Sequence, residues 1–184
     1  MKAWIVSLLL LLWCIPAQAF HLSDVRLDTE LGYGHAYPLG GTEAGDLRNT
    51  EFTSVAMDAS VPVWESGNFV VTQDIGLNYL HFQEPNGFGL FAFESTTLKW
   101  LAFYPITPFI SARLGVGGVD VNNHWTVQSD GLLFLLEPSI GIEINDQLKI
   151  GYGLHHLSNA NINPPNCGIN SHFIYVVVSL PLKD

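Results

Sequence analysis

Residues 132–159 read LLFLLEPSIGIEINDQLKIGYGLHHLSN. Apolar side chains alternate with polar, charged or glycine residues through two runs, which Asp146-Gln147 separates. Because successive side chains of a strand point to opposite faces, this alternation predicts two antiparallel strands joined by a tight turn. One face of the pair is apolar along its whole length, while the other carries charges such as Glu143 and Lys149.

The same alternation recurs along most of the chain, with turn-forming residues between the runs. It predicts eight strands, at about 24–37, 52–65, 68–82, 88–104, 108–121, 132–145, 148–159 and 172–182. No segment has the period of an amphipathic helix, and no linker composition divides the chain. We therefore expect one all-β domain over residues 20–184.

The amino-terminal segment MKAWIVSLLLLLWCIPAQAF has the pattern of a secretory signal peptide. An apolar run follows a basic residue, and Ala17-Gln18-Ala19 provides small residues at the expected cleavage site. We assign residues 1–19 to the signal peptide. Cys14 follows the bulky Trp13, which disfavours a lipoprotein cleavage site.

Composition excludes several classes of protein. Seven Lys and Arg stand against 17 Asp and Glu, a net charge of −10 that argues against nucleic acid as a partner. Cys167 is the one cysteine after the signal peptide and cannot form an internal disulfide. It and the histidines lack a known metal-ligand spacing, so we expect no metal and no cofactor. No later stretch has the ~20 apolar residues of a membrane helix.

Two architectures fit eight alternating strands. A soluble, lipocalin-like lipid carrier turns its apolar face inward, whereas an outer-membrane barrel turns it toward lipid. Runs of ~9–11 residues or more, aromatic residues at strand ends and the alternation of short and long connections favour the membrane barrel. We predict an eight-stranded antiparallel transmembrane β-barrel in the outer membrane of a Gram-negative bacterium, with its amino terminus in the periplasm. The ending Leu182-Lys183-Asp184 departs from the terminal aromatic residue of many such barrels.

The strand over residues 148–159 carries polar residues on its apolar face. His156 and Ser158 continue the row of Leu154, near the outer membrane surface. Residues two apart on one face lie ~6.5 Å apart, and His with Ser is a base–nucleophile pairing used in acyl transfer. The parity of the last strand places Asn170 on the same face, where it is expected to approach His156. Polar residues of an ordinary interfacial belt explain the pattern equally well.

The stretch 151–180, GYGLHHLSNANINPPNCGINSHFIYVVVSL, resembles the carboxyl-terminal signature of PagL-type lipid A 3-O-deacylases, outer-membrane esterases. The resemblance is carried by His156-x-Ser158-Asn159-Ala160, by Pro165-Asn166-x-Gly168 and by a final strand. It implies hydrolysis of the 3-hydroxyacyl chain esterified at position 3 of lipid A in lipopolysaccharide. It also implies an active site on the outer surface of the barrel and association into homodimers.

The resemblance gives His156 the role of general base, Ser158 that of nucleophile, and Asn159 a part in holding the oxyanion. The acidic residue of the family corresponds by spacing to Asn170. An amide accepts a hydrogen bond from imidazole but does not stabilise imidazolium by charge, so a weakened or inactive enzyme is an alternative. His172, on the same face, is a second candidate for orienting the base.

The outer segments are acid-rich, with Glu43, Asp46, Glu51 and Asp130 opposed by Arg48, although lipid A carries phosphates. Three interpretations remain open: a lipid A deacylase, a non-enzymatic or weakened outer-membrane barrel, and a soluble lipid carrier.

Overall fold

The computed structural model describes residues 24–36, 51–83, 86–121, 132–160, 162 and 169–182. The expected signal peptide, Cys167, the Pro165-Asn166-x-Gly168 segment and the loop residues Glu43, Asp46, Arg48 and Asp130 lie outside these ranges.

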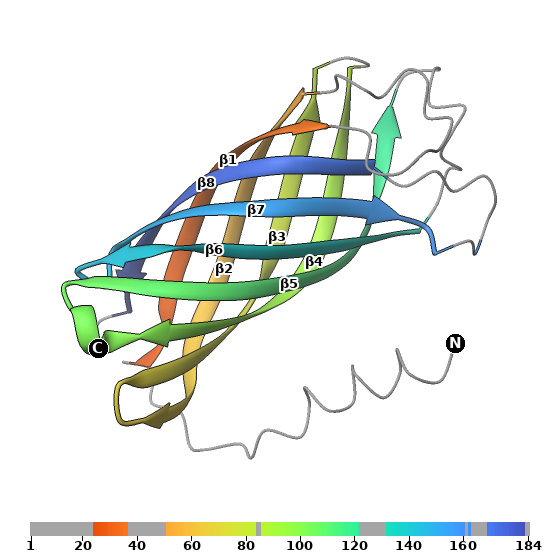
Figure 1. Ribbon diagram of the computed structural model, residues 1–184. Helices are drawn as coiled ribbons and strands as arrows, with labels where there is room; N and C mark the ends of the chain where they lie inside the picture. The colour runs from red at the N-terminus through yellow and green to blue at the C-terminus, as the bar shows by residue number, and fades with distance from the viewer. Residues whose placement is uncertain are drawn as a thin grey trace.

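The described chain forms a closed antiparallel barrel of eight strands in sequence order, and β8 pairs with β1 to close it (Figure 1). The strands are β1 (Arg26–Ala36), β2 (Glu51–Ser66), β3 (Phe69–Phe82), β4 (Gly87–Trp100), β5 (Ile106–Val121), β6 (Leu133–Ile144), β7 (Leu148–Ser158) and β8 (Ile169–Pro181). The predicted architecture is confirmed. Closure pairs every strand on both sides and leaves no open sheet edge, which a membrane wall requires.

Two strand boundaries differ by more than two residues from those predicted. The strand expected to reach residue 104 ends at Trp100, and a short 3-10 helix, Leu101–Phe103, begins the turn. Its geometry is fixed by main-chain bonds that the alternation of side chains does not encode, including Leu101 N–H to the Asn68 carbonyl at 2.7 Å. The last strand begins at Ile169, earlier than expected, because its first residues pair with the end of β7.

The hairpin between β6 and β7 shows how the sequence fixes the register of the barrel. Asn145 and Asp146 have positive φ angles of 52° and 56°, and the Gln147 N–H donates to the Ile144 carbonyl at 3.1 Å. Positive φ at both central residues is the mark of a type I′ turn, whose twist matches that of antiparallel strands. Asn and Asp adopt this backbone conformation more readily than other non-glycine residues.

The apolar rows lie outside the barrel. Ile75 on β3 is 68% exposed and Ile140 on β6 is 61% exposed, whereas Glu30 on β1 and Glu143 on β6 are each 0% exposed. A soluble carrier requires the opposite arrangement, so the lipocalin-like alternative is wrong. The outward apolar face is what a hydrocarbon environment selects.

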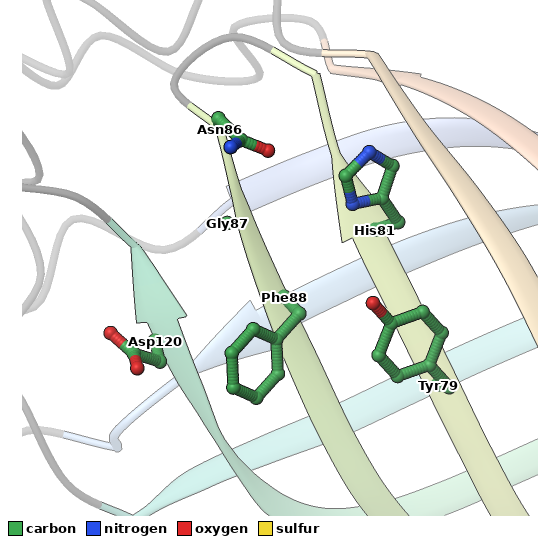
Figure 2. A pocket seen from close by; sticks show the side chains of 6 residues that line it. All are labelled: Tyr79, His81, Asn86, Gly87, Phe88 and Asp120. Atoms are coloured by element: carbon green, nitrogen blue, oxygen red, sulfur yellow. The ribbon is translucent and has the colours of Figure 1, made fainter.

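Aromatic side chains mark both ends of this outer wall. Phe69 and Trp100 stack at the end of the short turns, with ring centroids 6.1 Å apart. Tyr79 and Phe88 stack at the opposite end of the same two strands, with centroids 6.3 Å apart (Figure 2). Such girdles lie at the two membrane interfaces, so the wall between them spans the hydrocarbon region.

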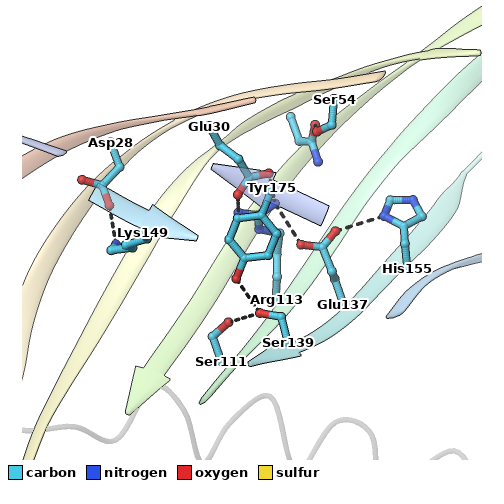
Figure 3. A network of polar contacts seen from close by, with 11 residues as sticks. Asp28, Glu30, Ser54, Ser111, Arg113, Glu137, Ser139, Lys149, His155 and Tyr175 are labelled. Atoms are coloured by element: carbon cyan, nitrogen blue, oxygen red, sulfur yellow. Dashed lines mark hydrogen bonds and ion pairs between the residues drawn. The ribbon is translucent and has the colours of Figure 1, made fainter. Parts of the chain in front are cut away.

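Charged side chains fill the lumen (Figure 3). Arg113 is bidentate to Glu30, at 3.0 and 2.6 Å, and lies 3.1 Å from Glu137. Other ion pairs complete this charged lumen: Lys149 with Asp28 at 2.5 Å and Lys99 with Glu143 at 2.6 Å. These contacts join strands distant in the sequence, so they tie the barrel together across its interior.

The lumen changes character toward its outer end, where a group of buried apolar side chains replaces the charges. Phe52 stacks on Phe173 at 5.9 Å and lies 5.9 Å from Phe82. Gly34 makes room for this packing, because a Cβ there would lie 2.1 Å from the Phe52 ring. Side chains of the described strands therefore pack against one another inside the barrel.

Candidate active site

His156 and Ser158 lie on the outward face of β7, as the parity predicts. Both are half-buried, whereas Leu154 in the same row is 40% exposed. β7 runs from the short turn at Asn145-Asp146 toward the long 159–168 connection, so the two residues lie near the outer membrane surface. The pair therefore lies on the lipid-facing wall, toward its outer end.

Asn170 approaches His156 from the neighbouring strand. The two residues are register partners of β7 and β8, and the His156 Nδ1 lies 2.7 Å from the Asn170 Oδ1. Because an amide oxygen only accepts hydrogen bonds, this contact assigns the proton of the neutral ring to Nδ1. The other ring nitrogen, Nε2, is then the basic one. The predicted contact between His156 and Asn170 is present.

Ser158 is the last residue of β7 and pairs with Phe134 on β6. It lies two residues beyond His156 on one face, ~6.5 Å along the strand. Among the described residues, no hydrogen bond joins its hydroxyl to the His156 ring. Catalytic hydrogen bonds are often long in a structure without substrate and tighten in the complex.

A tight turn follows Ser158. Ala160 has a positive φ of 52°, and the Ile162 N–H donates to the Asn159 carbonyl at 3.0 Å. The Asn159 side chain is 1% exposed and alternates in parity with Ser158, so it does not share the outward face. The backbone therefore turns sharply immediately after Ser158.

His172 lies on the same outer face, but its ring contacts Tyr152. The Tyr152 hydroxyl and the His172 Nδ1 are hydrogen-bonded, and the two rings stack with centroids 5.7 Å apart. Sequence reasoning did not single out Tyr152 as a neighbour of the candidate site. The parity of Tyr152 on β7 places it on the outer face, and the register between β7 and β8 brings it beside His172. That register is fixed only when the β7–β8 hairpin has folded.

His155 points into the lumen and belongs to a different environment. Its Nδ1 lies 3.0 Å from Glu137, and its ring packs 4.9 Å from that of Phe52. The parity of His155 along the strand, opposite to that of His156, indicates the inward direction but not this pairing.

The described residues contain no group of three or more His, Cys, Asp or Glu side chains arranged to hold a metal ion. In the same part of the chain, no helix has the length and apolarity needed to cross a membrane.

Comparison with known proteins assigns the chain to a family. Residues 53–179 match the family model described as lipid A 3-O-deacylase (PagL). The chain belongs to the PagL family. The matched region begins within β2, ends within β8 and includes every candidate catalytic residue.

Solved structures show the same fold. The crystal structure of the outer-membrane enzyme PagL aligns with a TM-score of 0.69 at 19% identity, covering 83% of this chain and 99% of that one. Neisserial surface protein A aligns with a TM-score of 0.57 at 11% identity, covering 87% and 98%. A search of curated proteins found no match. Family and fold together make this chain a multi-pass barrel of the Gram-negative outer membrane.

Proposed function

We propose that this protein is a serine esterase that removes the 3-hydroxyacyl chain esterified at position 3 of lipid A, at the outer leaflet. The observation that carries the proposal is the His156–Asn170 hydrogen bond of 2.7 Å on the lipid-facing wall, beside Ser158 on the same strand face. Membership of a deacylase family supports the reaction class.

In the first step the Ser158 Oγ attacks the ester carbonyl carbon while the His156 Nε2 takes the hydroxyl proton. The tetrahedral intermediate then collapses. The bond from the carbonyl carbon to the sugar oxygen breaks, and His156 returns the proton to that oxygen. Water, deprotonated by His156, then attacks the acyl-enzyme and releases a 3-hydroxy fatty acid and free Ser158. This is the general pattern of acyl transfer by a Ser–His pair.

Asn170 positions the base in this mechanism. Its Oδ1 accepts the Nδ1 proton of His156 and so holds the ring in the tautomer that leaves Nε2 basic. It supplies no negative charge to stabilise the imidazolium that forms as Ser158 attacks. A slower enzyme than one with a carboxylate at this position is the expected result.

Oxyanion stabilisation is assigned to the segment after Ser158. Because the Asn159 side chain is buried, main-chain N–H groups of the Asn159-Ala160 turn are the proposed donors, with the Asn159 side chain holding the turn in place. Each donor in such a site contributes about 2.7–4 kcal/mol to transition-state stabilisation.

The test is lipid A mass spectrometry of cells with and without the protein. We expect the loss of one hydroxyacyl mass, and we expect Ser158→Ala to abolish it while the barrel still folds. Unchanged lipid A from folded wild-type protein in a permissive membrane would overturn the proposal. That result would favour a weakened or non-enzymatic barrel, the alternative suggested by Asn170 at the position of the family's acidic residue.

We also propose that two copies associate, as the family resemblance implies, through the middle of the β3–β4 wall, around Gln73 and Glu94. Gln73 and Glu94 face outward there and are hydrogen-bonded to each other. Along β4, Glu94 is six residues from Phe88 and six from Trp100. If the strands tilt by ~40°, Glu94 lies about 15 Å along the membrane normal from each aromatic girdle. A carboxylate facing lipid at that depth is costly, whereas a second copy offers both donors and acceptors to the same pair.

Disulfide trapping tests this interface. Ala92→Cys, two residues from Glu94 on the same face, is expected to cross-link in membranes, and Ile140→Cys on β6 is the control. Equal cross-linking at both positions would place the contact elsewhere.

A further inference from the structure

A shallow pocket lies at the outer end of β3, β4 and β5 (Figure 2). It encloses about 250 Å³ and is lined by Tyr79, His81, Asn86, Gly87, Phe88 and Asp120. These residues are separate from the candidate active site, which lies on β7 and β8. The inference below does not depend on the proposed esterase activity.

The floor of the pocket is aromatic. The Tyr79 and Phe88 rings are 41% and 46% exposed and stack with an interplanar angle of 20°. Figure 2 shows the Phe88 ring between Asp120 on one side and Tyr79 on the other. The face of an aromatic ring carries partial negative charge and attracts the partial positive charge of C–H groups.

Polar side chains surround this floor. His81 and Asp120 are the register partners of Phe88 on its two neighbouring strands, so the three form one row across the wall. Asn86, immediately before β4, adds an amide. Together they offer a carboxylate acceptor, an imidazole, and an amide that both donates and accepts.

The stacked pair at the opposite end of β3 and β4 provides an internal comparison. Phe69 and Trp100 have nearly the same centroid distance, 6.1 Å, and an interplanar angle of 14°. Phe69 pairs with Ser66 on β2 and with Trp100 on β4, so neither of its register partners is an imidazole or a carboxylate like those that flank Phe88. An interfacial girdle needs only the rings, so the polar row and the hollow at the outer end call for another explanation.

We propose that this pocket binds a pyranose ring from the head group of an outer-leaflet glycolipid. The C–H face of the sugar packs on Phe88 and Tyr79, and its hydroxyl groups donate to Asp120 and exchange hydrogen bonds with Asn86 and His81. A carboxylate acceptor suits hydroxyl donors and disfavours a phosphate. The pocket lies at the height of the head groups, because it continues the outer aromatic girdle. The bound glycolipid is a neighbour of the molecule that enters the candidate active site.

The experiment uses the full mature barrel in detergent micelles, carrying Ser158→Ala throughout to prevent turnover. The probe is the oligosaccharide of lipopolysaccharide from which all fatty acids have been removed. Its binding is detected by saturation-transfer NMR, as transfer of saturation from the protein to the C–H protons of the sugar rings. We expect saturation transfer to the sugar, at least tenfold weaker binding in Phe88→Ala and Asp120→Asn, and unchanged binding in Trp100→Ala. Heat-modifiable migration on gels verifies that each variant is folded.

Several outcomes would overturn the proposal. One is the absence of saturation transfer to the sugar from the protein whose pocket is unchanged. Another is a loss of sugar binding in Trp100→Ala equal to that in Phe88→Ala. A third is complete competition by phosphoethanolamine, which would identify an ammonium site. A second set of measurements with intact lipopolysaccharide distinguishes a membrane-embedded glycolipid from a free oligosaccharide as the ligand. Tighter binding of the intact lipid than of the free oligosaccharide, lost in Phe88→Ala, supports a membrane-embedded ligand. Equal binding of both forms overturns the glycolipid assignment.

Discussion

His155 and His156 are neighbours in the sequence and occupy opposite environments. His155 is 1% exposed, lies 3.0 Å from Glu137 and packs beside Phe52 inside the barrel. His156 faces outward, contacts Asn170 at 2.7 Å and lies in one row with Ser158. The pleat of one strand therefore separates a histidine that holds the lumen together from one placed for chemistry. Residue type alone does not separate the two histidines, whereas the parity of each position along the strand does.

The largest expected effect is a loss of deacylation rate without a loss of barrel structure. His156→Gln is expected to lower the deacylation rate by at least about 10³-fold, because His156 is the proposed base and an amide does not take up the Ser158 proton. Initial rates on purified lipid A, normalised to folded barrel, measure this loss. His155→Gln is the matched control, and a comparable loss of rate in that variant would contradict the division between the two histidines.

The next effect is on stability and has the reverse pattern. His155→Leu removes a buried partner of Glu137 and is expected to cost about 1–3 kcal/mol, because part of the hydrogen bonding of that carboxylate is lost. His156→Leu replaces a polar group on the lipid-facing wall and is expected to change stability by less than about 0.5 kcal/mol. Urea unfolding in lipid vesicles measures both. Equal destabilisation by the two changes would argue that His156 is also a structural residue.

A smaller effect sharpens the role of Asn170. Asn170→Asp supplies the negative charge that the present contact lacks and is expected to raise the turnover number about tenfold, equivalent to about 1.4 kcal/mol. Asn170→Leu removes the acceptor and is expected to lower turnover. Single-turnover assays separate this change from lipid binding. Unchanged turnover in Asn170→Leu would remove Asn170 from the mechanism.

The smallest expected effect concerns the second outward histidine. Tyr152→Phe removes the hydroxyl that bonds His172 but keeps the stacked ring. We expect less than about a threefold change in turnover, because the register partner of His156 on β8 is Asn170, whereas His172 pairs with Leu154. A loss near that of His156→Gln would make His172 the orienting group in place of Asn170.

Alternation alone predicted much of this protein. The row of Leu136, Ile140 and Ile142 opposite Glu137 and Glu143 fixed the two faces of β6, and the other strands followed the same rule. The number of strands, their order and the shared face of His156, Ser158 and Asn170 could be predicted, because side-chain direction in a strand has a period of two. The carboxyl end of β4 and the start of β8 could not be predicted, because hydrogen bonds in the turn and pairing with the neighbouring strand set them.

Tertiary structure decided everything that depends on which residues meet across the barrel. Alternation is the same for a soluble and a membrane barrel, and only closure showed Ile75 outside and Glu30 inside. The contact of Arg113 with Glu30 and the hydrogen bond of Tyr152 with His172 join residues from different strands. Their meeting is set by the register and curvature of the closed sheet. A linear sequence specifies directions along each strand, whereas distances between strands exist only after the sheet has closed.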